Sequence, residues 1–260
     1  TINTIWVGQL LGEGALAATA NANIVLFAVF AVIFGFGSAA TVKVGHHFGA
    51  RDLDAVRRVS GSGIGFCLAL SVAMSAAGWL LAGPVLHALA TPATIHDDAL
   101  IYLRVIFLTV PLGSTSLTIS MMLRGTGDAR TPLHAMILGT VLGIVLNPLL
   151  ILGLGPFPRL GIAGAGIANA LASAIGLVTM IALIYRRDMA IRLRGAEFAY
   201  LLPGLRELAF VVAKGLPMGA QMLITSAAGI IMMGLVNREG LMATAAYGAC
   251  LQIWGYVQMP

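Results

Sequence analysis

The sequence predicts an all-α polytopic membrane protein, and its composition and charge pattern are the observations that predict it. Hydrophobic residues make up 59% of the 260 residues, charged residues only 10%, and the mean hydropathy is +0.95. A soluble domain carries roughly 25% charged residues, so this chain has too few to cover a surface in water. Charged residues also divide the chain into long uncharged runs, and the basic ones concentrate in alternate gaps.

The uncharged runs give the expected helices in order. A helix needs about 20 apolar residues to cross the hydrocarbon, and helices are expected because unpaired backbone groups in lipid are too costly. Run 1–12 is too short, and we expect it to be the outer end of a helix that starts before this sequence. Run 240–260 is expected to begin a further helix. The complete spans are 14–42, 59–96, 105–123, 131–158, 160–185 and 215–237.

The gaps between the runs predict the orientation of these helices. Twelve Lys and Arg residues lie in gaps 43–58, 124–130 and 186–214, and three lie in the alternate gaps. Basic residues concentrate in cytoplasmic loops, so these three gaps are expected on the cytoplasmic side. Gap 124–130 is therefore a cytoplasmic turn, with Thr131 and Pro132 expected as N-cap and first-turn residue of the next helix.

A weak internal repeat predicts two lobes. "EGALAATANA" at 13–22 resembles "EGLMATAAYG" at 239–248, and six helices separate them, so both copies point the same way. Such repeats are related by an axis along the membrane normal. We expect an N-terminal bundle at 1–185, a cytoplasmic linker at 186–214 and the start of a second bundle at 215–260. Within the linker, "LPGLRELAFVVAK" is expected to form a short interfacial helix.

Four stretches carry a resemblance to a known family. They are "NTIWVGQLLGEGALAAT", "LRGTGDARTP", "LNPLLILGLGP" and "GIAGAGIANA". With them the chain resembles the multidrug and toxic compound extrusion (MATE) family. The resemblance implies twelve helices in two six-helix bundles, of which this sequence would hold the end of helix 1, helices 2 to 7 and the start of helix 8. It also implies alternating-access export of amphipathic, often cationic drugs or metabolites in exchange for protons or sodium.

The resemblance also points to site residues. It implies a carboxylate at the positions of Asn3 and Asn147 and, in some members, at that of Thr225, so amides and a hydroxyl stand where a proton carrier is expected. An amide does not titrate, which leaves H+ or Na+ open as the coupling ion; no other cofactor and no metal are expected. The candidates for binding substrate or cation are Asn3, Ser120, Asn147, Asn169 and Thr225. Alternatively, Asn147 satisfies the backbone that Pro148 interrupts, where the Ile144 carbonyl loses its partner.

Two further groups of residues are candidates for conformational roles. Arg124, Asp128 and Arg130 are expected to brace the cytoplasmic ends of helices 4 and 5 and to bias which side of the cavity opens; the alternative is a topology marker plus a helix cap. Three prolines in membrane runs are candidate hinges or tolerated kinks, namely Pro111, Pro148 and Pro217. Small residues that recur every four positions from Gly164 to Gly176 are expected to pack helices.

Other function classes fit less well. The runs contain no HExxH, no GxSxG and no paired aspartates, so an enzyme is not expected. No aromatic-basic patch indicates nucleic acid. The alternative to drug export is a flippase for a lipid-linked saccharide, or another dedicated metabolite exporter of a related family. We expect a monomeric, multi-pass protein of the bacterial plasma (inner) membrane whose partners are the bilayer and small amphipathic substrates.

Overall fold

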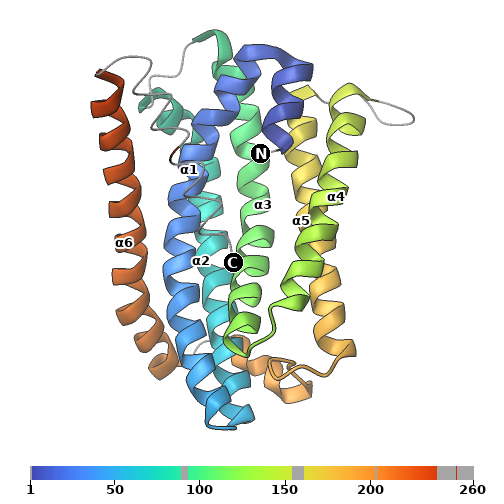
Figure 1. Ribbon diagram of the computed structural model, residues 1–260, viewed down its shortest axis with the longest axis vertical. Helices are drawn as coiled ribbons and strands as arrows, with labels where there is room; N and C mark the ends of the chain where they lie inside the picture. Colours follow the sequence, from blue (N-terminus) through green and yellow to red (C-terminus); the bar gives the residue numbers. More distant parts are fainter. Residues whose placement is uncertain (1, 89–92, 154–160, 203, 239–249, 251–260) are drawn as a thin grey trace. The chain divides into compact units, whose positions relative to one another are not determined.

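The computed structural model describes residues 2–88, 93–153, 161–202, 204–238 and 250, with side chains mostly from Leu26 onward. These residues form helices and short connections (Figure 1). The helices are α1 (Ile2–Gly49), α2 (Leu53–Ala88), α3 (Ala93–Gly125), α4 (Arg130–Leu152), α5 (Gly161–Arg186), the 3-10 helix η1 (Gly195–Leu201) and α6 (Leu205–Arg238). The chain divides into two compact units, 1–219 and 220–260, and each is described by itself.

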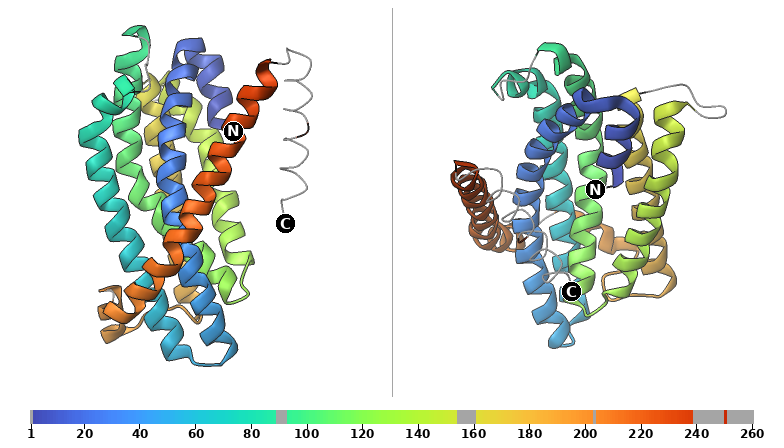
Figure 2. Two further views of the ribbon diagram at one scale, coloured as in Figure 1. Left: turned by 90° about the vertical axis from the view of Figure 1, so that its left-hand side faces the viewer. Right: turned by 45° about the horizontal axis from the view of Figure 1, so that its top comes forward.

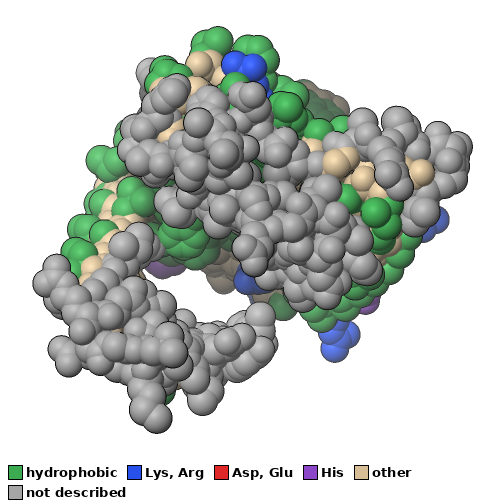
Figure 3. Space-filling view, turned by 90° about the horizontal axis from the view of Figure 1, so that it is seen from above, with side chains coloured by type: hydrophobic (Ala, Val, Ile, Leu, Met, Phe, Trp, Pro, Cys, Tyr) green, Lys and Arg blue, Asp and Glu red, His purple; other side chains and the backbone are tan. Residues whose placement is uncertain are grey.

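Six segments of the described helices are long and apolar enough to cross a membrane, which confirms the predicted all-α polytopic fold. They cover 26–49, 53–84, 100–125, 130–152, 163–186 and 207–229. Large hydrophobic side chains such as Leu80, Leu108 and Val178 are exposed on them. The described side chains on the flanks in Figure 3 are likewise mainly hydrophobic. Exposed apolar flanks on helices of this length suit a lipid environment.

Two helix boundaries differ from the sequence prediction. The backbone of α1 is one helix from Ile2 to Gly49, although Glu13 separates two uncharged runs, and Figure 1 shows it bending near its N-terminal part. Glutamate is a good helix former, so a single charge does not end a helix. The expected short interfacial helix is not a separate element, because its residues from Leu205 onward belong to the continuous helix α6. This helix continues to Arg238, with Pro217 inside it.

The helices of unit 1 run up and down beside one another. α3 contacts α1, α2 and α5, and α4 packs along α5 (Figures 1 and 2). The turns α1–α2 and α3–α4 and the connection after α5 gather at the lower end of Figure 1, as the charge pattern requires. Buried residues from α1, α2, α3 and α5 form the core, including Ile33, Val56, Leu103, Met122 and Met180.

The cap of α4 differs from the prediction. The carboxylate of Asp128 accepts hydrogen bonds from the backbone N–H of Arg130 at 2.9 Å and of Thr131 at 3.2 Å. Ala129 occupies the N-cap position, and Thr131 is buried inside the first turn. The prediction of Thr131 as N-cap was therefore wrong, because Asp128 begins the cap three residues earlier.

Removing this cap is expected to destabilise the protein. Burial raises the pKa of Asp128, but hydrogen bonds from Thr131 and Arg130 and the charge of Arg187 outweigh it and hold the pKa below its ordinary 3.8. A lowered pKa means that the stabilisation is complete above the ordinary pKa and is lost as the pH falls through the folded-state value. Asp128→Ala should cost about 1 kcal/mol at neutral pH, measured by thermal unfolding in detergent. Asp128→Asn, which keeps an acceptor, is the control; equal melting temperatures for Asp128→Ala and the parent would contradict the cap.

Candidate functional site

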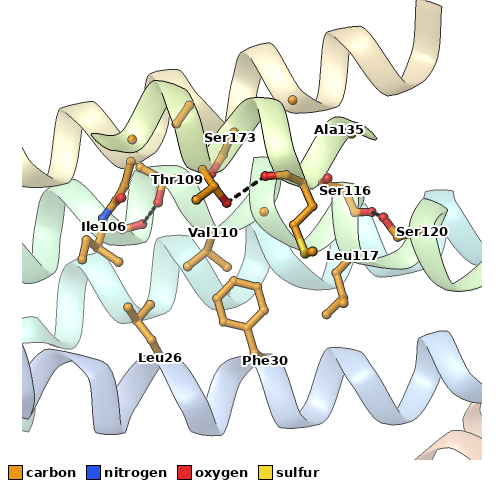
Figure 4. Close-up of a pocket in the computed structure, with 18 of the residues that line it drawn as sticks. Leu26, Phe30, Ile106, Thr109, Val110, Ser116, Leu117, Ser120, Ala135 and Ser173 are labelled. Carbon is orange, nitrogen blue, oxygen red and sulfur yellow. Dashed lines mark hydrogen bonds between the residues drawn. The ribbon is translucent and has the colours of Figure 1, made fainter. Parts of the chain in front are cut away.

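A cavity of about 850 Å³ lies within unit 1 among α1, α3, α4 and α5. One face of α3 supplies much of its wall, including Thr109, Gly113, Ser116 and Ser120. These residues are three or four positions apart, so they share one side of the helix. Figure 4 shows Phe30 reaching from α1 toward this face. The cavity is thus lined by apolar side chains interspersed with small and hydroxyl-bearing ones.

The cavity brings together three of the five predicted binding residues. Ser120 on α3, Asn147 on α4 and Asn169 on α5 all line it. The side chain of Asn3 lies outside the described residues. Thr225 is exposed in the second unit, and its hydroxyl donates to the backbone carbonyl of Gln221 at 2.8 Å.

Asn147 is the most deeply buried polar group of the cavity wall. Its side chain is only 1% exposed, and Nδ2 donates to the carbonyl of Gly143 at 2.6 Å. This bond orients the amide and leaves Oδ1 without a hydrogen-bond partner in the described part of the chain. A buried acceptor without a partner costs about 1–3 kcal/mol. The amide nitrogen contacts the carbonyl of Gly143 and not that of Ile144, so it does not repair the bond that Pro148 removes.

Three hydroxyls of the wall donate to backbone carbonyls of their own helices. Thr109 donates to the Ile106 carbonyl at 2.8 Å, and Ser120 donates to the Ser116 carbonyl at 2.7 Å (Figure 4). Thr140 repeats the pattern on α4, with a bond of 2.8 Å to Met136. A hydroxyl that has used its one hydrogen retains acceptor capacity on its oxygen. Together with Oδ1 of Asn147, these hydroxyl oxygens give the described wall several hydrogen-bond acceptors.

Arg124 is the one charged residue among the described lining residues, at the C-terminal end of α3. A cation is favourable there because the helix dipole is negative at that end. Arg124 and Arg130 form no ion pair with any residue that the structure describes, whereas Asp128 binds the first turn of α4. The three residues share a turn without forming an ion-pair cluster, and their role in opening stays a prediction.

The three candidate hinge prolines all lie inside helices: Pro111 in α3, Pro148 in α4 and Pro217 in α6. The hydroxyls of Ser114 and Thr115 donate to the Pro111 carbonyl at 3.0 and 2.7 Å. Close to Pro217 and within unit 1, a Cβ atom on Gly35 would lie 2.6 Å from the Gly215 carbonyl oxygen. Hinge motion itself stays a prediction.

Sequence reasoning missed several cavity residues, among them Phe30, Thr109, Thr140 and Ser173. The available signal was the helical spacing of small and hydroxyl residues from Thr109 to Ser120. Of the predicted packing residues, Gly164 lies against α4, where its Cβ would meet the Leu150 carbonyl oxygen at 2.5 Å.

Comparison with known proteins gives consistent matches. The MatE family model matches residues 1–149. The probable multidrug resistance protein YoeA of Bacillus subtilis (strain 168) is 30% identical over 254 residues, which cover 98% of this chain and 55% of that protein. The FAD transporter of Shewanella oneidensis is 26% identical over 251 residues, covering 95% and 54%. The chain therefore spans about half the length of the curated relatives that it matches.

Solved structures show the same fold. One described as the outward-facing conformation of a multidrug resistance MATE family transporter of the MOP superfamily superimposes with a TM-score of 0.82. It is 23% identical, and the match covers 99% of this chain and 55% of that one. At this identity the likeness establishes the fold alone.

Proposed function

The chain belongs to the MATE family, and on that premise we propose that it forms the first half of a secondary active efflux transporter of a bacterial plasma membrane. It would act as a monomer and export amphipathic drugs or metabolites by alternating access. The family assignment supports the expectation that the chain is part of a multi-pass transporter and not an enzyme.

The cavity of unit 1 is the observation that carries this proposal. Its wall is mainly apolar, and no carboxylate occurs among the described lining residues. Such a surface binds lipophilic molecules through shape and dispersion, with a few polar groups setting orientation. The free Oδ1 of Asn147 suits a substrate that carries a hydrogen-bond donor. We therefore expect broad, lipophilic, cationic or neutral substrates.

Asn147 is the proposed polar contact for the substrate or the coupling cation. Its free Oδ1 suits either an N–H donor or a sodium ion, since hard cations take amide and carbonyl oxygens as ligands. An amide neither gains nor loses a proton near neutral pH. If protons drive transport, the titrating group must therefore be another residue of the complete protein.

A dedicated metabolite exporter is the second candidate. The similarity to a FAD transporter favours it, as does the position of Arg124, whose guanidinium suits an anionic group at one end of the cavity. A flippase for lipid-linked saccharides is less favoured, because the described wall offers this single cation for a phosphate headgroup.

Expression of the complete protein in a drug-sensitive host separates these functions. Drug export predicts raised tolerance to several chemically unrelated dyes or antibiotics, measured as growth inhibition. The matched control is Ser173→Trp, which fills part of the cavity. Unchanged tolerance with normal membrane expression, accompanied by release of a flavin nucleotide into the medium, would favour the dedicated exporter.

A further inference from the structure

The connection between α5 and α6 follows one face of α2. The carboxylate of Glu197 accepts a hydrogen bond from Arg57 at 3.0 Å. Next, Tyr200 packs against Gly61, whose Cβ would lie 2.7 Å from the Tyr200 Cβ, and the Leu201 carbonyl packs directly on Gly65. Positions 57, 61 and 65 are four apart and share one side of α2. Residues 197–202, here called the linker wedge, therefore climb along α2 by successive turns.

After the linker wedge, the chain returns to the arginine end of α2, close to Arg57. Glu207, in the first turn of α6, lies 3.6 Å from Arg58. Glu197 and Glu207, at the two ends of this segment, thus pair with the adjacent residues Arg57 and Arg58 of α2. This arrangement places Leu201 and Leu202 at its tip.

The tip lies beyond the charged part of α2. Arg58 is the last charged residue before the uncharged run that starts at Val59, and Gly65 is seven residues further along. At 1.5 Å per residue this is about 10 Å along the helix axis. The uncharged run belongs to the membrane layer. The tip of the linker wedge is therefore level with the start of the hydrocarbon and not with the bulk cytoplasm.

The linker wedge exposes one large apolar side chain at its tip and another next to Glu197 at its base. Leu202 is 80% exposed, more than any other large hydrophobic side chain in the described part of the chain, and Phe198 is 50% exposed. Both residues belong to unit 1. Apolar side chains in this position are stabilised by acyl chains and destabilised by water.

The surroundings of the linker wedge are basic. Residues 186–214 contain six Lys and Arg against three Asp and Glu. The side chains of Arg58 and Arg194 are half-exposed although each has an acidic partner. Basic groups next to the cytoplasmic leaflet attract anionic phospholipids. We propose that the linker wedge inserts Phe198 and Leu202 into the inner leaflet, and that the arginines at its base, Arg58 foremost, bind anionic phospholipid headgroups.

Spin labelling of the complete protein in vesicles tests the insertion. A nitroxide is attached at Leu202→Cys or, as the matched control, at Ala196→Cys, which is exposed before Glu197 in the same connection. Cys67→Ala and Cys250→Ala remove the native thiols of this chain. We expect the ratio of collision with oxygen to collision with a water-soluble nickel chelate to be several-fold higher at position 202. Equal ratios at both positions would overturn the insertion.

The lipid composition tests the headgroup contact. In vesicles of phosphatidylcholine mixed with phosphatidylglycerol, the ratio at position 202 should rise above its value in phosphatidylcholine alone. Arg58→Gln should abolish this rise, whereas Arg51→Gln in the α1–α2 turn should preserve it. A ratio that is independent of phosphatidylglycerol, or a rise that survives Arg58→Gln, would overturn the headgroup contact while the insertion stands. Neither measurement depends on the transported substrate.

Discussion

Replacing Asn147 by Leu is expected to reduce export by the complete protein at every pH, by about tenfold or more. The substitution keeps the number and branching of the side-chain heavy atoms but removes the one buried acceptor of the cavity wall that has no partner in the described structure. A hydrogen-bond donor that loses its acceptor in a buried site costs about 1–3 kcal/mol, and 1.4 kcal/mol is a factor of ten. Dye uptake into proteoliposomes, measured across a pH series, gives the effect directly.

Asn147→Asp is the informative companion variant. A carboxylic acid buried without a compensating cation favours its neutral form and titrates nearer neutral pH. This variant should therefore add a pH dependence to export that the parent lacks in this half. Parent-like uptake by Asn147→Leu would show that the amide serves only its bond to Gly143, and the proposed contact would be wrong.

The second large effect is expected at the contact between α4 and α5, which carry one side of the cavity. Gly164→Ala places a Cβ atom 2.5 Å from the Leu150 carbonyl oxygen and 2.8 Å from its carbon. These are backbone atoms, so the helices must separate to make room. Overpacking of this kind costs typically 1–3 kcal/mol and occasionally more. The melting temperature in detergent should fall by several degrees, with loss of export.

Gly176→Ala is the matched control on the same helix. Its Cβ would lie 3.5 Å from the Ala135 carbonyl oxygen, an ordinary contact. Alanine also favours the helix over glycine by up to about 1 kcal/mol. Gly176→Ala should therefore melt at or above the parent temperature. Equal melting temperatures for the two variants would contradict the close contact between Gly164 and the Leu150 carbonyl.

The membrane helices could be predicted from the sequence because length, charge and apolarity act locally. The ends of the helices depended on individual side chains: Asp128, and not Thr131, caps α4, and Glu13 did not interrupt α1. The path of the linker wedge along α2 could not be predicted, because it depends on contacts between Tyr200 and Gly61, far apart in sequence. The glycines of α2 were its only signal.

The candidate site was partly predictable for a similar reason. Ser120, Asn147 and Asn169 were found through a family resemblance, and the cavity joins them. Thr140 carries little signal, since hydroxyls in membrane helices commonly bond to their own backbone, as this one does. Which helix faces line a cavity depends on how α3, α4 and α5 pack, and a single sequence does not specify that packing.

The central claim is that substrate passes through the cavity of unit 1. Filling this cavity tests it most directly, by comparing dye export by Ser173→Trp and Val178→Trp in the complete protein. Ser173 lines the cavity, whereas Val178 on the same helix is 65% exposed on an apolar flank. With equal membrane expression, we expect Ser173→Trp to lower the export rate at least about tenfold, which corresponds to an activation barrier higher by roughly 1.4 kcal/mol. Val178→Trp should export like the parent. Parent-like export by Ser173→Trp would contradict the claim.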